Sequence, residues 1–261
     1  MGYLKEKLQD CEEIAGMHVS LGDACVSELL AGVGFDFLWI DTEHTAIDYQ
    51  ALQNHLIAAR AGGTSTLVRI PENNKVLVKR VLEMGPTGII FPMINTAEEA
   101  ETAMKSCLYP PYGIRGYGPI RAVSYGQEDS DEYIQKKSME ICRCIQIETE
   151  TAVKNLPEIV KNPYIDAYIF GPCDLSASIG EINQVFGERT TALIDEAIAI
   201  LKKNRKSIGV STGACDKKTI QYWHNRGINM ISAGTDHLYL STMAEKTLRN
   251  IRQVQAERTL E

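Results

Sequence analysis

The stretch FDFLWIDTEHTAID, residues 35–48, joins a nearly continuous apolar run to an abrupt cluster of charge. The apolar run stops at Asp41, and Glu43 and His44 follow within the next three residues. An apolar run of this length is typical of a strand buried on both faces of a parallel sheet. Because an isolated buried charge is costly, charges at the end of such a strand require partners or a function. The sequence therefore predicts a buried parallel strand with a polar, functional tip.

The same pattern recurs along the chain. Short β-rich runs alternate with helical patterns, several of which close with glycine, the usual residue after a helix end. About eight strand–helix units in 261 residues predict an α/β fold, a (β/α)8 TIM barrel, rather than an open doubly wound sheet. We expect residues 1–261 to form a single barrel domain. The strands are predicted at 17–21, 37–41, 66–70, 88–93, 144–148, 167–171, 207–211 and 230–234.

Composition and charge exclude several classes of protein. The formal charge is −7, from 27 basic and 34 acidic residues, and the pI is about 5.4, so no affinity for nucleic acid is expected. No apolar run approaches the roughly 18 residues of a membrane span, and the first residues show no secretion or myristoylation signal. The seven cysteines, with no CxxC pair, fit a reducing compartment. We expect a cytoplasmic protein with small-molecule partners.

In a (β/α)8 barrel the carboxyl ends of the strands meet at one mouth, where active sites lie. The predicted strand ends of this chain bring many polar residues to that mouth. The first, seventh and eighth strands supply smaller polar groups, namely His18 or Ser20, Ser211 with Thr212, and Ser232 with Thr235. The principal candidates are Asp41, Glu43, His44, Arg69, Gln146, Glu148 and Asp174.

These residue types suit one kind of chemistry. Glu148 and Asp174 come from neighbouring strands and provide two carboxylates for a hard divalent cation, with coordination positions left for water and substrate. Asp41, three residues before His44, predicts an imidazole that is oriented by a carboxylate and acts as a base near neutral pH. Arg69 offers a fixed fork of N–H donors to a developing oxyanion.

Each candidate also has a structural interpretation. Asp41 and Asp174 could cap the helices that follow them, a common position for aspartate. Glu148 could form a salt bridge with Arg69, and His44 could be an ordinary hydrogen-bonded histidine. The functional interpretation is favoured because titratable groups stand at several independent strand ends, where a barrel that only had to pack would be free to end in neutral residues.

Six motifs follow one another along the chain: FDFLWIDTEH, LVRIPENN, GIIFPMINTAEEA, YPPYGIRGYG, IQIETETAVKNL and GPCDLSASIG. Together they resemble the HpcH/HpaI family of metal-dependent class II pyruvate aldolases, which includes 4-hydroxy-2-oxoheptanedioate aldolases. The resemblance extends from Ser27 to the SAGTD motif at 232–236. It implies a phosphoenolpyruvate/pyruvate-type barrel whose long C-terminal helix is exchanged between the subunits of dimers, three of which form a hexamer. The polar tail after His237 suits that helix.

The resemblance also implies a role for each site residue. Glu148 and Asp174 match the metal-binding carboxylates of the family, which hold Mg²⁺, Mn²⁺ or Co²⁺. His44 and Asp41 match its base dyad. The remaining matches are Arg69, which binds pyruvate and its enolate, Gln146 beside the site, and the backbone amides near Cys173 and Asp174, which bind the pyruvate carboxylate.

The implied reaction is the reversible cleavage of a 4-hydroxy-2-oxo acid to pyruvate and an aldehyde through a metal-bound pyruvate enolate. In this reaction the metal would polarise the 2-oxo group, Arg69 would stabilise the enolate oxygen, and His44 would move the proton.

Other functions stay open on the sequence alone. A Schiff-base aldolase would need a lysine in the mouth, but no predicted strand contains one, and Lys75 lies at the start of a helix. The small residues at 211–214 and 232–236 would suit a phosphorylated substrate. A distant branch of the superfamily acts on acyl-CoA thioesters, and a barrel without catalytic activity is the last alternative.

Some residues depart from the resembled pattern. His18 stands where the best-known members carry a large aromatic residue, and Cys173 replaces a small alanine. We expect His18 to reshape the pocket that receives the aldehyde. The loop at 109–126 carries Arg115 and Arg121, for which the sequence predicts either contact with an acceptor carboxylate or salt bridges between subunits.

Overall fold

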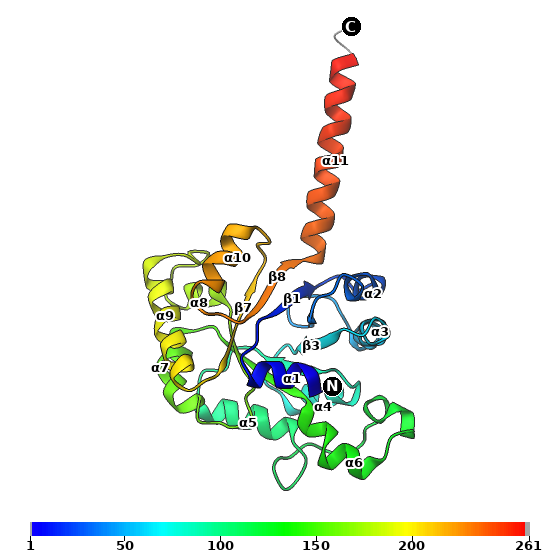
Figure 1. Ribbon diagram of the computed structural model, residues 1–261, viewed down its shortest axis with the longest axis vertical. Helices are drawn as coiled ribbons and strands as arrows, with labels where there is room; N and C mark the ends of the chain where they lie inside the picture. The colour runs from blue at the N-terminus through cyan, green and yellow to red at the C-terminus, as the bar shows by residue number, and fades with distance from the viewer. Residues whose placement is uncertain (1, 259–261) are drawn as a thin grey trace.

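The computed structural model describes residues 2–258, and within them eight parallel strands pair in chain order and close on themselves, with β8 returning to β1 (Figure 1). The predicted (β/α)8 barrel is confirmed, and each predicted strand is present. β1 begins earlier than predicted, at Ile14 instead of Met17. The strands are β1 Ile14–Val19, β2 Phe37–Asp41, β3 Ser65–Arg69, β4 Gly88–Phe91, β5 Cys142–Ile147, β6 Ala167–Phe170, β7 Ser207–Thr212 and β8 Met230–Thr235.

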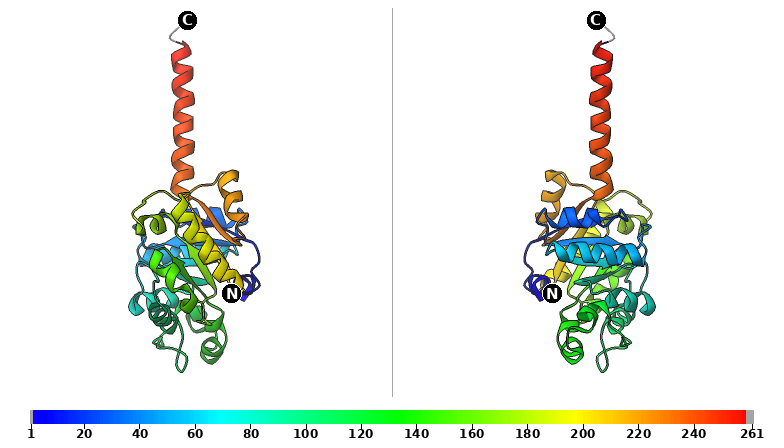
Figure 2. Two further views of the ribbon diagram at one scale, coloured as in Figure 1. Left: turned by 90° about the vertical axis from the view of Figure 1, so that its left-hand side faces the viewer. Right: turned by 90° about the vertical axis from the view of Figure 1, so that its right-hand side faces the viewer.

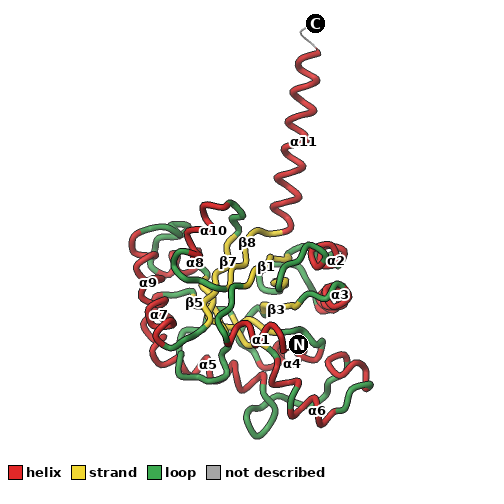
Figure 3. Tube along the Cα trace, viewed as in Figure 1, coloured by secondary structure: helices red, strands yellow, loops and turns green. Residues whose placement is uncertain are grey.

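Helices surround the barrel, joined to the strands by loops (Figure 3), and local sequence sets where several of them begin. The side chains of Asp48, Asn74 and Thr149 each accept a hydrogen bond from the first turn of the following helix. Thr96 and Glu99 form a reciprocal capping box. The helices are α1 Gly2–Gln9, α2 Cys25–Ala31, α3 Tyr49–Ala61, α4 Lys75–Glu83, α5 Ala97–Cys107, α6 Ser130–Gln135, α7 Glu150–Ile159, α8 Pro172–Ser178, α9 Glu188–Lys203, α10 Lys217–His224 and α11 Asp236–Arg258, with 3-10 turns at Arg121–Gly126 and Lys137–Glu140.

Short helices are what the sequence pattern misses, namely α1, α6 and α8. The sixth strand was predicted at 167–171, with Asp174 following its end, and no helix was predicted there. β6 ends at Phe170, and Pro172 opens a helix. Proline suits the first helical position because its fixed φ matches the helix and its missing N–H is not needed there.

The interior of the barrel is filled in layers. At the N-terminal end α1 acts as a plug, with Leu4 and Leu8 buried in the same cluster as interior strand residues such as Trp39. Cys142 and Cys144 lie in this cluster as buried, unpaired thiols. The next interior layer, toward the carboxyl ends of the strands, is polar.

One helix, α11, stands away from the barrel (Figures 1 and 2). Its first residue is anchored, because the Asp236 carboxylate accepts hydrogen bonds from the backbone N–H groups of Ser20 and Leu21. Beyond that turn, apolar side chains such as Leu240 and Met243 are exposed. Over the described residues, no helix, α11 included, has the length and apolar character needed to cross a membrane.

Candidate active site

Four of the predicted site residues lie at the carboxyl ends of barrel strands. Asp41 is the last residue of β2, Arg69 is the last of β3, and Gln146 lies near the end of β5, with Glu148 just beyond it. Each of the four is at most 7% exposed. Side chains alternate between the two faces of a strand, and these positions fall on the interior face. The polar layer predicted at the mouth is therefore present.

Asp41 and Arg69 form a buried, bidentate ion pair. Arg69 Nε donates to Asp41 Oδ1 at 2.9 Å, and Arg69 Nη2 donates to Oδ2 at 2.7 Å. Burial alone would raise the pKa of the Asp41 carboxyl, but the nearby His18 imidazole and the hydrogen-bonded Arg69 guanidinium hold that pKa well below its usual range. Asp41 does not cap a helix, since α3 is capped by Asp48. The pair fixes the guanidinium in one orientation.

The outer edge of the Arg69 guanidinium faces the centre of the mouth. Its Nη1 lies 3.0 Å from Glu43 Oε2 and 3.5 Å from Gln146 Oε1. The alternative in which Glu148 pairs with Arg69 is not seen, because the ion pairs of this arginine in the described chain go to Asp41 and Glu43.

Glu148 is a buried carboxylate with few donors. It accepts a hydrogen bond from Met93 N at 3.1 Å and a short one from Gln146 Nε2. Burial raises the pKa of the Glu148 carboxyl to about 7, and the negative charge of Asp174 acts in the same direction. Gly171 makes room for this carboxylate, because a Cβ there would lie 2.3 Å from Glu148 Oε1. The two hydrogen-bond donors of Glu148 therefore do not offset the combined negative charge of Glu148 and Asp174.

Asp174 lies in the first turn of α8 and is exposed toward the mouth side of the barrel. No side-chain cap bond is present at the start of α8, so Asp174 is not held as a helix cap. Within residues 2–258, no cluster of three or more His, Cys, Asp or Glu side chains has the arrangement of an all-protein metal cage. Two carboxylates with surplus negative charge instead fit a hard cation that completes its coordination with water and substrate.

The expected contact between Asp41 and His44 is not formed. The His44 side chain is 65% exposed, and its Nε2 lies 3.6 Å from Glu43 Oε2. The imidazole that faces Asp41 is that of His18, with Nε2 3.6 Å from Oδ2. His44 follows the turn that ends β2 and leaves the interior face, whereas His18 lies on β1 directly beside Trp39 in the strand register. Because Trp39 and Asp41 lie on the same face of β2, the pairing of His18 with Trp39 would have indicated that His18 approaches Asp41.

Cys173 lies at the mouth of the barrel, whereas the two loop arginines, Arg115 and Arg121, contact other parts of the chain. Cys173 is exposed in the first turn of α8, where backbone N–H groups lack helical acceptors and can bind an anion. Arg115 is buried between the rings of Tyr109 and Tyr133 and donates to Tyr133 Oη at 3.0 Å. Arg121 donates to a backbone carbonyl of the same chain. These contacts lie within this chain, and Arg115 Nη2 also lies 3.7 Å from Glu83 Oε1. The expected roles toward an acceptor carboxylate or a second subunit stay predictions.

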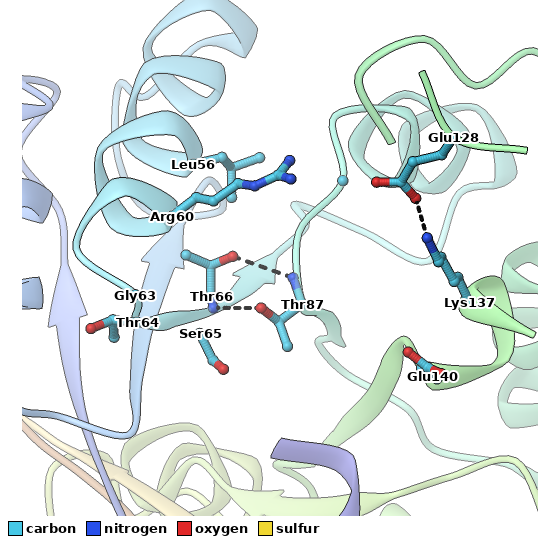
Figure 4. Close-up of a pocket in the computed structure, with 11 residues that line it drawn as sticks. Leu56, Arg60, Gly63, Thr64, Ser65, Thr66, Thr87, Glu128, Lys137 and Glu140 are labelled. Atoms are coloured by element: carbon cyan, nitrogen blue, oxygen red, sulfur yellow. Dashed lines mark hydrogen bonds and ion pairs between the residues drawn. The ribbon is translucent and has the colours of Figure 1, made fainter. Parts of the chain in front are cut away.

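A separate pocket of about 370 Å³ lies at the opposite end of the strands (Figure 4). Thr66 and Thr87 bond each other's backbone N–H groups there, and Lys137 pairs with Glu128 at 2.6 Å. These groups satisfy one another at the N-terminal face, where barrel residues serve stability. The mouth at the carboxyl ends is therefore the candidate active site.

The closed α/β barrel, with a fixed arginine, paired carboxylates and histidines at its mouth, defines a TIM-barrel enzyme. Residues 15–241 match the model of the HpcH/HpaI aldolase/citrate lyase family, and the chain belongs to that family. The expectation of an aldolase, a carbon–carbon lyase, is thereby confirmed.

Named relatives and a solved structure agree with this membership. The chain is 33% identical over 230 residues to the 4-hydroxy-2-oxo-heptane-1,7-dioate aldolase of Shigella sonnei, covering 88% of this chain and 87% of that one. It is 31% identical over 234 residues to the hydroxypyruvate/pyruvate aldolase of Roseobacter denitrificans, covering 89% and 90%. The crystal structure of an HpcH/HpaI aldolase/citrate lyase family protein from Burkholderia cenocepacia J2315 superposes with a TM-score of 0.90 at 28% identity, over 97% of this chain and all of that one.

Proposed function

We propose that this protein is a divalent-metal-dependent aldolase that reversibly cleaves a 4-hydroxy-2-oxo acid to pyruvate and an aldehyde. The observation that carries the proposal is the buried Glu148 carboxylate, with its raised pKa, on the same mouth as Asp174 and the fixed Arg69. The names of the two aldolase relatives support the substrate class.

Each site residue has a task in this proposal. Glu148 and Asp174 would hold Mg²⁺, Mn²⁺ or Co²⁺, and the bound cation would supply Lewis acidity to the 2-oxo group. Arg69 neutralises negative charge that develops on the oxygen, in an orientation set by Asp41. Gln146 and the backbone N–H groups around Cys173 and Asp174 would bind the oxygen atoms of pyruvate.

His44 is proposed as the base on the solvent side of the mouth. Because Asp41 is occupied by Arg69, the acid beside this imidazole is Glu43, at 3.6 Å. His44 would accept a proton from carbon 3 of pyruvate and return it in the reverse direction.

The alternative functions have less support. A Schiff-base route needs a lysine in the mouth. The barrel strands of the described chain contain no lysine, and Lys5 and Lys7 are bonded to Asp166 and Asp36 at the plugged end. For a phosphorylated substrate, the small residues after β7 and β8 are the one supporting feature in the described chain. For an acyl-CoA substrate, the described residues show no corresponding feature.

We also propose that the protein forms a homo-oligomer, a hexamer built from dimers, in which α11 of one copy packs on a second copy. α11 is free of the barrel beyond its first turn. The outer face of the barrel between β1 and β8 carries a groove of about 400 Å³ that includes Ala15, Ile231 and Ala233. An apolar helix face and an apolar groove left uncovered in one chain are suited to each other.

A cytoplasmic location is supported by the seven cysteines, which form no disulfide in the described structure.

The test is pyruvate release from a 4-hydroxy-2-oxo acid, coupled to lactate dehydrogenase. Protein treated with EDTA should be inactive and recover on addition of Mn²⁺, and Glu148→Ala should stay inactive with Mn²⁺ present. Glu150→Ala is the matched control, because this partly exposed glutamate pairs with Lys154 on α7. Activity that is indifferent to EDTA would exclude the metal route, and no pyruvate under any condition would exclude the substrate class.

A further inference from the structure

Three side chains from three strands form a chain of polar contacts on one side of the mouth. Ser211 Oγ on β7 lies 3.3 Å from His18 Nδ1 on β1, and His18 Nε2 lies 3.6 Å from Asp41 Oδ2 on β2. The His18 ring is stacked on Trp39, with 5.0 Å between ring centroids and 26° between planes. The His18 side chain is 12% exposed. The stacking fixes the ring plane, so that each ring nitrogen faces one partner.

The partners decide which nitrogen carries the proton. Asp41 is kept ionised by the two hydrogen bonds from Arg69, so its carboxylate only accepts. His18 Nε2 must therefore donate toward Asp41, which leaves Nδ1 as an acceptor for the Ser211 hydroxyl. The order is hydroxyl, imidazole and carboxylate, the arrangement by which a hydroxyl is activated for proton transfer.

These contacts lie across the mouth from the carboxylate that is proposed to hold the cation. In a closed eight-stranded barrel β1 faces β5, so His18 and Glu148 come from opposite strands. Next to Ser211 in the register of β7 and β8 is Ser232, and its hydroxyl is buried with no hydrogen-bond partner in the described structure. A ligand whose 2-oxo end lies at Glu148 would place its far end on this side.

We propose that Ser211, His18 and Asp41 form a proton relay for the hydroxyl group on carbon 4 of the substrate. The inference rests on the proposed aldolase function. In cleavage, the substrate hydroxyl gives its proton to Ser211 Oγ while Ser211 gives its own proton to His18 Nδ1. The O–H electron pair becomes the second bond of the aldehyde carbonyl, and the C3–C4 pair passes to the pyruvate enolate fragment. Asp41 stabilises the imidazolium, and the steps reverse in aldol addition.

The charged groups around His18 favour a neutral imidazole that is ready to accept this proton. Burial lowers the pKa of the His18 imidazole. Asp41 on β2 and Asp236 at the start of α11 oppose that shift, and Arg69 on β3 adds to it. The ring therefore enters the reaction uncharged at neutral pH.

The test separates the two halves of the reaction. His18→Phe keeps a ring on Trp39 but removes both nitrogens, and Ser211→Ala removes the hydroxyl. We expect kcat for cleavage to fall roughly 100-fold in His18→Phe and roughly tenfold in Ser211→Ala. Exchange of the pyruvate methyl protons with deuterium, followed by NMR, involves no substrate hydroxyl and should stay within about threefold of wild type. Ser207→Ala, on the interior face of β7 at the plugged end, is the matched control.

A second measurement needs no variant to be active. Nitrogen-15 NMR of the five histidines, with His18 assigned by its loss in His18→Phe, should show Nε2 protonated and Nδ1 unprotonated near neutral pH. The opposite tautomer, cleavage rates unchanged in both variants, or an equal loss of cleavage and exchange would each overturn the relay. The failure of the aldolase function itself looks different, since wild type would then release no pyruvate.

Discussion

At the residue scale, Asp41 and His55 show how polar contacts offset the burial of ionisable groups. Asp41 and Arg69 satisfy each other at the mouth, and Ser27 Oγ lies 2.8 Å from His55 Nδ1 between α2 and α3. An unpaired buried charge would cost several kcal/mol, whereas a pair with good geometry offsets much of that cost. His55 is the less satisfied case, because its Nε2 has no hydrogen-bond partner in the described chain.

His55 should make stability depend on pH. Burial lowers the pKa of its imidazole, so the unfolded chain, with a histidine pKa near 6.5, binds a proton that the folded chain does not. Stability is full above about pH 6.5 and falls as the pH is lowered, by up to about 1.4 kcal/mol per pH unit and proton. Urea unfolding between about pH 7.5 and 5 measures this, and the double variant Ser27→Ala/His55→Leu should show a shallower fall. An unchanged slope in the double variant would contradict the assignment.

At the scale of single elements, α1 is a structural plug that is separate from catalysis. Leu4 and Leu8 enter the interior cluster, and Lys5 Nζ lies 2.8 Å from both carboxylate oxygens of Asp166. These contacts lie at the N-terminal end of the barrel, away from the mouth. The helix escapes sequence-based prediction because only two apolar residues mark its buried face, and their neighbours become a core only when the barrel closes.

Leu8→Ala should therefore destabilise the protein without changing its catalysis. Leu8 is fully buried, and truncation of such a leucine costs about 2–5 kcal/mol. Thermal or urea unfolding would report the loss, while kcat and KM for pyruvate release below the unfolding range should match wild type. Glu6→Ala, on the exposed side of α1, is the control and should leave stability within about 0.5 kcal/mol. A large change in KM for Leu8→Ala would show that the two ends of the barrel are coupled.

At the scale of the whole molecule, the outlying helix α11 is the feature that a single chain does not explain. Its 23 residues span about 34 Å, and Leu248, Ile251 and Val254 are each about half exposed or more. Its first turn is tied by Asp236 to the end of β1, two residues from His18. The segment that follows β1 therefore contacts the helix proposed to hold the subunits together and also lies close to the mouth of the barrel.

Removal of α11 after residue 237 should reduce the assembly to smaller species. Light scattering coupled to size-exclusion chromatography would show wild type as a multimer and the truncated chain as a monomer or dimer. Ala15→Arg should act in the same way, because Ala15 is exposed in one chain but lies in the groove that α11 of a second copy would fill. A wild-type monomer, or a truncated chain with the mass of the intact assembly, would refute the exchange.

The sequence by itself determined the parts of this protein that depend on local periodicity. Strand and helix patterns are set by neighbouring residues, so the order of the strands, the closed barrel and the family were predictable. The strand ends also placed Asp41, Arg69, Gln146 and Glu148 at one mouth, since parallel strands share one carboxyl end.

Only the tertiary structure decided which of these groups touch. His44 is three residues from Asp41 in the chain, yet the carboxylate faces Arg69 and His18, because register across β1, β2 and β3 sets side-chain distances and a turn carries His44 outward. Arg115 is likewise buried by rings that the fold brings around it. The direction of α11 was also decided only by the tertiary structure, because it depends on how the helix leaves the barrel after β8.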